Sequence, residues 1–420
     1  MAQAEATQEL LTTADGTPLK TSLRRALRRN TIGALLLVAP LFIFILFSFL
    51  IPIFDMLARS IDNEVMEESM PNAMAALADW DGQDLPGEAV FEAMVLDLQI
   101  GRENRTIGRA AGRMNYAVPG FRGLIMGSAR RAGRIEGGPY REALIEVDEE
   151  WGEIETWQAL QQNSSTTTMG YYLNAVDLSF DLQGSVVAQP ETRRIYVGLF
   201  WRTLWMSCLI TFMTIALGFP IAYLLATLPM KTSNLLMILV LLPFWTSLLV
   251  RTTAWIVMLQ SEGVVNDLAV FIGLYDDDNR AQLIHNRIGT IVAMTHILLP
   301  FMVLPLYSVM KTIPPTYMRA ARSLGANQML AYWRVYVPQT VPGIGAGSIL
   351  VFILAIGYYI TPALVGGTSG TLISNQIAYH MQSSLNWGLA AALGAILLAL
   401  VLLLFAIYDR IVGIDNMKLG

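Results

Sequence analysis

The sequence has only one cysteine and three histidines among its 420 residues. Cys208 lies inside an apolar run, and with no second cysteine to pair with it cannot form a disulfide within the chain. No two of the histidines (His285, His296 and His380) share a helical turn, so they lack the close spacing of many metal-binding motifs. We therefore expect no metal site in this chain.

Charged residues are also scarce. Lys, Arg, Asp and Glu make up 15% of the chain, whereas about 25% is usual for a soluble domain. No basic run is long enough to neutralise several phosphates, so we do not expect nucleic acid as a partner. No arrangement of Ser, Cys, His and Asp suggests a nucleophile with its base, so we expect no catalytic residues and no enzyme activity.

A phosphate-binding loop is missing as well. Such a loop needs Gly-x-x-x-x-Gly-Lys followed by Ser or Thr, so that backbone amides and the lysine surround the phosphates. None of the four lysines, Lys20, Lys231, Lys311 and Lys418, has this context. We therefore expect this chain to bind no cofactor. If ATP hydrolysis drives its function, the ATPase is expected to be a separate subunit.

Long apolar runs are the dominant feature of the sequence. A membrane-spanning helix needs about 20 apolar residues, and continuous apolar composition is not the alternating pattern of barrel strands. Six runs qualify: residues 32–57, 196–225, 235–259, 288–310, 344–364 and 387–412. The first run is too long for a cleaved signal peptide, and no small-residue cleavage site follows it. We predict an all-α membrane protein with six transmembrane helices.

The basic residues of the short loops give these spans a direction. Lys and Arg accumulate on the cytoplasmic side of a membrane protein. They precede the first run and occupy the second-to-third and fourth-to-fifth connections, whereas the third-to-fourth connection is acidic. We therefore expect cytoplasmic tails at residues 1–31 and 413–420, a first transmembrane helix at 32–58, an extracytoplasmic insertion at 59–195 and a five-helix core at 196–412.

The basic connection at residues 311–340 has a clear internal pattern. Pro314 and Pro315 can begin a helix over residues 316–324, and Gly325 is well placed to end it in the left-handed conformation. A second helical piece over 328–337 should end at Pro338. This segment could be an amphipathic connector on lipid headgroups or a helix that fits a socket on another protein. Its small residues and glycine break favour the socket.

At this loop the sequence resembles the permease subunits of ABC importers. The stretch Tyr-Met-Arg-Ala-Ala-Arg-Ser-Leu-Gly-Ala-Asn at 317–327, followed by Val335 and Pro338, is similar to the family's shared cytoplasmic loop. The resemblance implies a coupling helix that docks on an ATPase subunit. The residues that it implies in this contact are Thr316, Arg319, Ala320, Ala321, Leu324, Gly325 and Ala326.

Further segments, at residues 218–223, 242–246, 251–255, 262–266 and 361–367, resemble the spermidine/putrescine-type subfamily. This resemblance implies the type I ABC-importer permease fold in a bacterial inner membrane. It also implies three partners: ATPase subunits that hold ATP and Mg²⁺, a second permease subunit in a probable heterodimer, and a periplasmic solute-binding protein. The expected solute is a polyamine, an opine or a similar amine or amino-acid-like compound.

The sequence departs from the family at two places. Arg319 stands where the coupling loop usually has Glu, which reverses the charge offered to the ATPase. Tyr358 stands where the polyamine transporters tend to have an acidic residue, and an acidic group would suit a dication. The substrate class therefore stays open at this point.

Aromatic and cationic residues near the span ends are candidates for the substrate path. These are Phe244, Trp245, Arg251, Tyr358 and Tyr359. Each aromatic could instead anchor a helix at the membrane interface, and Arg251 could extend toward the headgroups instead of contacting solute. The other functional class is an ion-coupled secondary transporter or channel, which usually needs ionisable groups in the membrane, and no intramembrane carboxylate pair is present.

The insertion at 59–195 is too long for a simple loop. Residues 88–99 and 106–116 have helical patterns, and residues 176–180 alternate like a strand. We therefore expect mixed, mainly helical structure. The insertion could be a cap that shields loop edges or a docking surface for a partner that delivers substrate.

Overall fold

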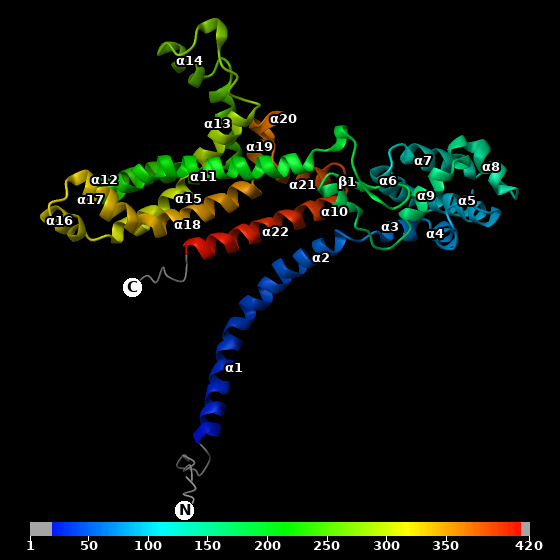
Figure 1. Cartoon of the computed structure of the whole chain (residues 1–420), viewed down its shortest axis with the longest axis horizontal. Coiled ribbons are helices and arrows are strands. Elements are labelled where there is room, and N and C mark those ends of the chain that lie inside the picture. The colour runs from blue at the N-terminus through cyan, green and yellow to red at the C-terminus, as the bar shows by residue number, and fades with distance from the viewer. Residues whose placement is uncertain (1–18, 413–420) are drawn as a thin grey trace, which may run out of the picture. The chain divides into compact units, whose positions relative to one another are not determined.

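The computed structural model of the chain describes residues 19–412 (Figure 1). Residues 1–18 of the expected N-terminal tail and the whole expected C-terminal tail, 413–420, lie outside the described residues. The chain divides into two compact units, Met1–Ala58 and Arg59–Gly420, and each is considered by itself.

The first unit is one long helical path. α1 (Leu19–Ile45) continues through the π-helical segment η1 (Leu46–Leu50) into α2 (Ile51–Arg59). Residues Asn30–Arg59 form a span with no buried residue in its most apolar window. The π segment contains Ser48, whose carbonyl would otherwise meet the ring of Pro52 in an α-helix. The wider turn thus lets the helix pass through proline.

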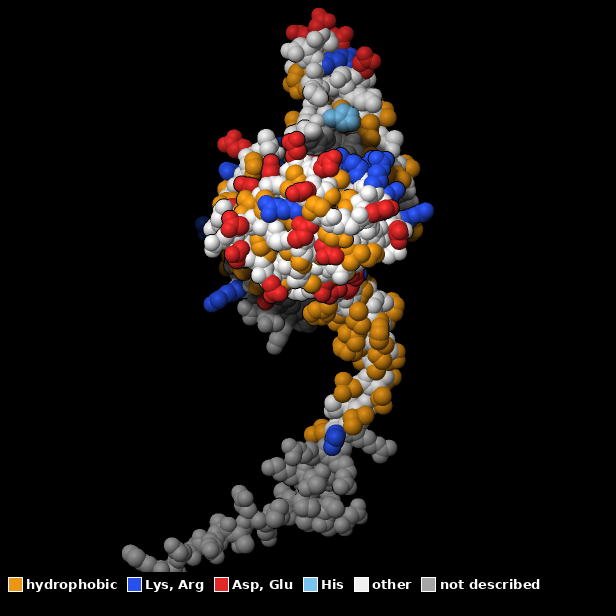
Figure 2. Space-filling model, turned by 90° about the vertical axis from the view of Figure 1, so that its right-hand side faces the viewer, with side chains coloured by type: hydrophobic (Ala, Val, Ile, Leu, Met, Phe, Trp, Pro, Cys, Tyr) orange, Lys and Arg blue, Asp and Glu red, His pale blue; other side chains and the backbone are white. Residues whose placement is uncertain are grey.

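The insertion is a helical domain with its own hydrophobic core. Phe91, Trp151 and Trp157 are all fully buried in it, and the Trp157 ring lies 4.6 Å from Phe91 and 5.2 Å from Trp151 between centroids. The outer face of the domain carries interspersed acidic and basic side chains (Figure 2). Its elements are α3 (Glu64–Ser69), α4 (Pro71–Ala78), α5 (Glu88–Glu103), α6 (Ile107–Ala117), α7 (Phe121–Ala132), α8 (Tyr140–Val147), η2 (Glu149–Gly152), α9 (Ile154–Gln162), α10 (Gly170–Ala175), β1 (Leu178–Phe180), β2 (Val186–Ala188) and η3 (Glu191–Arg193).

The local predictions for the insertion are confirmed. The helix expected over 88–99 is α5, and the one expected over 106–116 is α6. The alternating stretch at 176–180 contains β1, which pairs antiparallel with β2. The apolar residues Val90, Met94 and Leu98 of α5 lie on one face and are buried, as their spacing requires.

The membrane part is built around three mutually packed helices, α11 (Tyr196–Thr227), α15 (Arg287–Thr312) and α18 (Val337–Gly357). Close approach depends on small residues at the crossing points. A Cβ at Gly218 would lie 3.1 Å from Met302 Cγ, and one at Gly347 would lie 2.6 Å from Met302 Sδ. The last span, α22 (Trp387–Val412), packs against α18 of this group and against α21 (Ile373–Gln382).

The third predicted span is not one continuous helix, which corrects the expectation for residues 235–259. α12 (Met230–Trp245) and α13 (Leu248–Leu259), which leads to α14 (Val264–Phe271), meet at a bend of 97°. The break has a local cause. Ser247 is extended and its Oγ accepts a hydrogen bond from the Val250 amide at 3.2 Å, which starts a new helix.

The described residues therefore contain five spanning helices, or six spans when the bent pair is taken as one. The fifth span also differs from its predicted bounds of 344–364. Its helix runs from Gln328 to Gly357, through α17 (Gln328–Ala331), the π-helical η5 (Tyr332–Tyr336) and α18. The helical piece that begins at Gln328 was expected to end at Pro338, but it continues through this proline. The carbonyl of Arg334, which would face the ring of Pro338 in an α-helix, lies in the wider π segment.

The short elements lie at the two ends of the membrane helices. α16 (Pro315–Ser323) lies at one end, beside α17 and η5. Toward the other end lie α19 (Ile360–Val365), α20 (Gly367–Gly370) and α21 (Figure 1). α14 and η4 (Asp277–Asn279) belong to an arm, residues 260–285, that projects from the bundle beyond α13 (Figure 1). Acidic side chains gather at the tip of the arm that contains α14 (Figure 2).

Candidate functional site

The loop between α15 and α18 begins with a short helix whose two ends are well defined. Pro315 occupies the first turn of α16, where its missing N–H costs nothing. At the other end, Gly325 has a φ of +90°. Its amide donates to Arg322 O at 3.0 Å, and the Ala326 amide donates to Ala321 O at 3.1 Å. This pair of bonds is a Schellman motif, so the expected glycine stop is confirmed.

One face of α16 is turned away from the membrane bundle. Met318 is half-buried and packs against the bundle core, and Ala321 and Ala326 are also half-buried. The remaining predicted contact residues are exposed: Thr316, Arg319, Ala320, Leu324 and Gly325. Leu324 is 89% exposed. We call Thr316, Arg319, Ala320, Leu324 and Gly325 the coupling surface.

The coupling surface is basic and apolar. No Asp or Glu occurs between Lys311 and Thr340, and the exposed apolar side chains near it include Tyr317, Met329 and Trp333. A surface of this kind suits a protein cleft that offers apolar contacts and carboxylates. Arg319 is exposed, so the charge reversal relative to the family pattern faces outward.

Three tyrosines fasten this loop to the membrane bundle. Tyr223 is on α11, and its ring lies 5.4 Å from Tyr332 and 5.3 Å from Tyr336 of η5 between centroids, in edge-on contacts. Tyr332 and Tyr336 stack at 5.6 Å. This cluster was not predicted from the sequence. Its signal was the i, i+4 spacing of two aromatics beside a proline, which alone is not specific.

Two of the five candidate path residues come together. Arg251 is on α13, which packs against α15 and against α19, the helix that follows Tyr358 and Tyr359. Its Nε is buried and has no hydrogen-bond partner among the described residues. His296 Nδ1 in turn accepts a hydrogen bond from Trp255 Nε1 at 3.1 Å. Arg251 thus lies beside α15 and the end of α18, and does not stand alone at a span end.

Tyr358 and Tyr359 form the break between α18 and α19. The carbonyl of Tyr358 accepts from Ser374 Oγ at 2.7 Å, and that of Tyr359 accepts from Asn375 Nδ2 at 2.8 Å. The bond from Ser374 satisfies the Tyr358 carbonyl at the end of α18. The Tyr359 carbonyl also accepts the Ala363 amide at 3.0 Å, which starts α19. Tyr358 is half-buried and Tyr359 is 39% exposed.

The other two candidates lie apart from this group. The Phe244 ring packs on Phe301 at 5.4 Å. Trp245 is 86% exposed at the end of α12.

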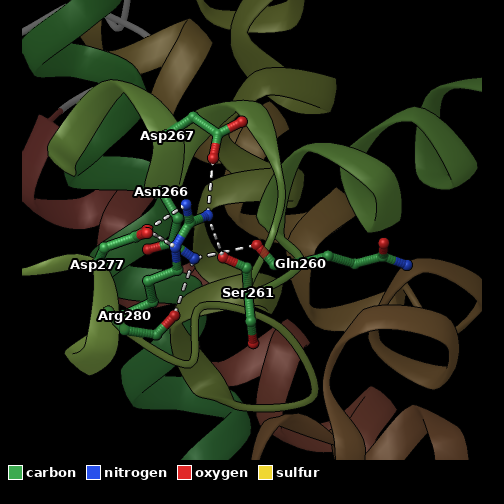
Figure 3. Close-up of polar contacts among 7 residues, drawn as sticks. Gln260, Ser261, Asn266, Asp267, Asp277 and Arg280 are labelled. Carbon is green, nitrogen blue, oxygen red and sulfur yellow. Dashed lines mark hydrogen bonds and ion pairs between the residues drawn. The ribbon is translucent and has the colours of Figure 1, made fainter. Parts of the chain in front are cut away.

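The arm that contains α14 is closed by a polar cluster (Figure 3). Arg280 donates through Nη1 to Asp267 Oδ1 at 2.7 Å and to Ser261 O at 3.0 Å, and through Nη2 to Asp277 Oδ1 at 2.6 Å. Asn266 is buried, and its Nδ2 donates to Gln260 O and Ala281 O, each at 3.0 Å. The hydrogen bonds to Asp277 and Asp267 raise the pKa of Arg280. These contacts join the segment before α14 to the segment that follows it.

Comparison with known proteins identifies this architecture. Residues 184–413 match the family described as "Binding-protein-dependent transport system inner membrane component". The match covers more than half of the chain, and the chain belongs to this family. The protein is therefore the permease component of an ABC importer, with the type I importer fold.

Several proteins that resemble this chain are named as permeases. The chain is 34% identical to the spermidine/putrescine transport system permease protein PotB of Haemophilus influenzae over 224 residues, which is 53% of this chain and 78% of the relative. It is 33% identical to PotB of Escherichia coli K12 over 224 residues, 53% and 81% of the two chains. It is 32% identical to the inner membrane ABC transporter permease protein YdcU of Escherichia coli K12, over 51% and 71% of the two chains.

Among solved structures, a bacterial ABC transporter involved in the import of the acidic polysaccharide alginate matches with a TM-score of 0.44 and 19% identity. The match covers 55% of this chain and 81% of that one. The matched family region begins at residue 184, so nearly all of the insertion lies outside it. Membership of the family removes the alternative of an ion-coupled secondary transporter or channel.

Proposed function

We propose that this permease passes a small amine solute of the polyamine type, or a related opine or amino-acid-like compound, from a periplasmic binding protein into the cytoplasm. The observation that carries the substrate class is the 34% identity to the spermidine/putrescine permease PotB over most of that protein's length. Arg251 and Tyr358 contribute to the path of the solute, because α13, which carries Arg251, packs against α15 and against α19, which follows Tyr358 and Tyr359.

ATP and Mg²⁺ act in separate ATPase subunits, on which the coupling surface docks. The exposure of Leu324 and Arg319 and the capped end of α16 support this contact. The tyrosine cluster supports a mechanical role, since Tyr223 belongs to α11 while Tyr332 and Tyr336 belong to η5, which packs beside α16 at the start of the fifth span. Movement of α16 therefore reaches a spanning helix directly.

A second permease subunit completes the translocation path, and we propose a heterodimer. The exposed apolar surface of α12 and α13, which includes Leu239, Trp245 and Val250, supports a partner or lipid on this side. The protein resides in a bacterial inner membrane with both ends cytoplasmic, as the distribution of basic loops predicts.

Uptake by the reconstituted complex tests the proposal. The tagged chain is purified from its native membrane with its partners and placed in proteoliposomes that enclose ATP. Labelled spermidine, putrescine, an opine and an amino acid are then offered with the binding protein. We expect saturable uptake of one amine class that requires ATP and survives an uncoupler. Uptake that proceeds without the ATPase and collapses with the uncoupler would contradict the proposal.

A further inference from the structure

The second unit contains a polar cavity of about 460 Å³ that the transport function does not use. It lies between α6 and α10 of the insertion and the connection that leads into α22. Four arginines and a single aspartate line it: Arg59, Arg109, Arg113, Arg122 and Asp62. The lining therefore carries an excess of positive charge.

Arg113 is the most unusual of these residues, because it is buried without a counter-charge. Its side chain is 8% exposed. Nε donates to Asn63 Oδ1 at 2.6 Å, and Nη2 donates to Asn163 Oδ1 at 3.0 Å. Both acceptors are neutral, and within the described part of the chain no carboxylate pairs with Arg113. Burial lowers the pKa of this guanidinium. A buried cation is costly unless a charge of opposite sign approaches it.

The surroundings hold this guanidinium in place. Asn63 Nδ2 donates to Asn163 O at 2.9 Å and to Ser165 O at 2.7 Å, and Asn163 Nδ2 donates to Ala159 O at 2.9 Å. The amide oxygens are thereby fixed toward Arg113. Its Cζ also lies 4.9 Å from the centroid of the Tyr171 ring, within the range of a cation–π contact. Arg113 is thus a preorganised part of the cavity.

The opposite wall adds the start of a long helix. Asn386 Oδ1 accepts from the Leu389 amide at 3.2 Å and caps α22. Trp387 and Gly388, which also line the cavity, are the first two residues of α22, where amides have no partner within the helix. The positive end of the helix dipole therefore faces the same region. This wall packs closely on the insertion. Gly388 lies so near the Tyr171 ring that an added Cβ would be only 2.4 Å from it.

Two cations in this cavity have no ion pair among the described residues. Arg109 is bound to Glu68 at 2.9 Å, but Arg113 and Arg122 have no such carboxylate. The cavity therefore offers a fixed guanidinium, a second guanidinium on α7 and the amino end of a helix. These are the groups with which proteins bind phosphate.

We propose that this cavity binds a phosphate-type oxyanion. The anion can be the phosphate of an anionic phospholipid headgroup or a soluble phosphate. The exposed Trp387, at the first residue of the last apolar span, places the site where headgroups lie. The bound anion would bridge the insertion and α22, neutralise Arg113 and stabilise their contact.

The experiment uses the full chain with its partners, purified in a neutral detergent and stripped of lipid. Thermal unfolding is followed against inorganic phosphate at constant ionic strength. In parallel, nanodiscs of phosphatidylcholine with and without phosphatidylglycerol are analysed for retained lipid by native mass spectrometry. Protection by phosphate identifies a soluble ligand, and selective retention of phosphatidylglycerol identifies a lipid. Either result supports the proposal.

Variants locate the effect. Arg122→Gln should weaken phosphate or phosphatidylglycerol binding about tenfold, because one charge-assisted hydrogen bond is lost. Gly112→Leu should abolish binding by filling the cavity. A Cβ at Gly112 meets no atom within 4 Å, so the first carbon of the new side chain fits without a clash. Arg141→Gln is the matched control, since Arg141 is an exposed arginine of the same domain outside the cavity.

The proposal is overturned by either of two results. One is that the wild-type complex is not protected by phosphate relative to phosphate-free buffer of the same ionic strength, and also retains no more phosphatidylglycerol than phosphatidylcholine. The other is that Arg122→Gln and Gly112→Leu bind as tightly as Arg141→Gln, which would place the anion elsewhere. Both outcomes are independent of solute uptake, so they leave the transport function unaffected.

Discussion

The glycine that ends the helix of the coupling loop offers the sharpest test of the loop's role. Gly325 has a φ of +90°, and a Cβ added to it would meet no atom within 4 Å. Gly325→Ala therefore introduces backbone strain and no steric clash. The perturbation is confined to the conformation that closes α16.

The expected size of the effect follows from the local geometry. A non-glycine residue in the left-handed region costs about 1–2 kcal/mol. The motif is closed by the two hydrogen bonds from Gly325 and Ala326, each worth about 0.5–1.5 kcal/mol. The strain is thus comparable with what holds the motif together. We expect a large fraction of Gly325→Ala molecules to lose the cap, and the stimulated ATPase rate to fall several-fold.

The assay is the ATPase rate of the reconstituted complex with and without loaded binding protein. Gly120→Ala is the matched control, because Gly120 has a φ of +100° and also has open space around a Cβ, but lies in the insertion. Gly325→Asn should recover part of the rate, since asparagine tolerates this backbone conformation better than alanine. All three variants should insert into the membrane at wild-type levels.

The reasoning is refuted if Gly325→Ala and Gly120→Ala give the same stimulated rate, or if Gly325→Asn is as impaired as Gly325→Ala. Either result would show that the conformation at Gly325 does not control coupling.

Three further predictions concern the insertion. Trp157→Ala should lower the free energy of unfolding of the insertion by about 3–5 kcal/mol, because the Trp157 ring is fully buried. The measurement is the loss of hydrogen-exchange protection in α5 and α9. Burial raises the pKa of Asp97, which accepts from the Ala73 amide at 2.7 Å. The folded state then binds the proton more tightly than the unfolded state, so stability should fall as pH rises through the window above the ordinary aspartate pKa. In thermal unfolding, Asp97→Asn should flatten this dependence of stability on pH. Gly388→Ala should increase hydrogen exchange in α10, since the new Cβ would lie 2.4 Å from the Tyr171 ring; unchanged exchange there would contradict the close contact.

The features predicted well from the sequence are those with local causes. The spans at 196–225 and 288–310 follow from continuous apolar composition, and α11 and α15 match them within a few residues. The helix over 316–324 follows from prolines before it and a glycine after it, and α16 matches it closely. Neither inference needs knowledge of distant residues.

The features that were missed depend on contacts between distant segments. The fifth span ends at Gly357, where Ser374 and Asn375 supply hydrogen bonds to the carbonyls of Tyr358 and Tyr359. Hydropathy continues past this point, so it gives no sign of the break. The bend after Trp245 was obscured in the same way, because apolar residues lie on both sides of it.

The cationic cavity lay furthest beyond sequence reasoning. Arg113 has no local pattern that marks it as buried, and its partners Asn63 and Asn163 are each 50 residues away along the chain. The wall at Trp387 is more distant still. Only the packing of the insertion on the start of α22 brings these residues together.

One helix connects the two ends of this architecture. α11 starts on the insertion, because Asp177 Oδ1 accepts from the Tyr196 amide at 2.9 Å and its Oδ2 accepts from the Val197 amide at 2.9 Å. Near its other end, Tyr223 contacts the coupling loop through Tyr332 and Tyr336. With 32 residues α11 is about 48 Å long. A rigid rotation of this helix, driven from α16, would therefore move the base of the insertion as well, and the insertion would respond to the ATPase cycle.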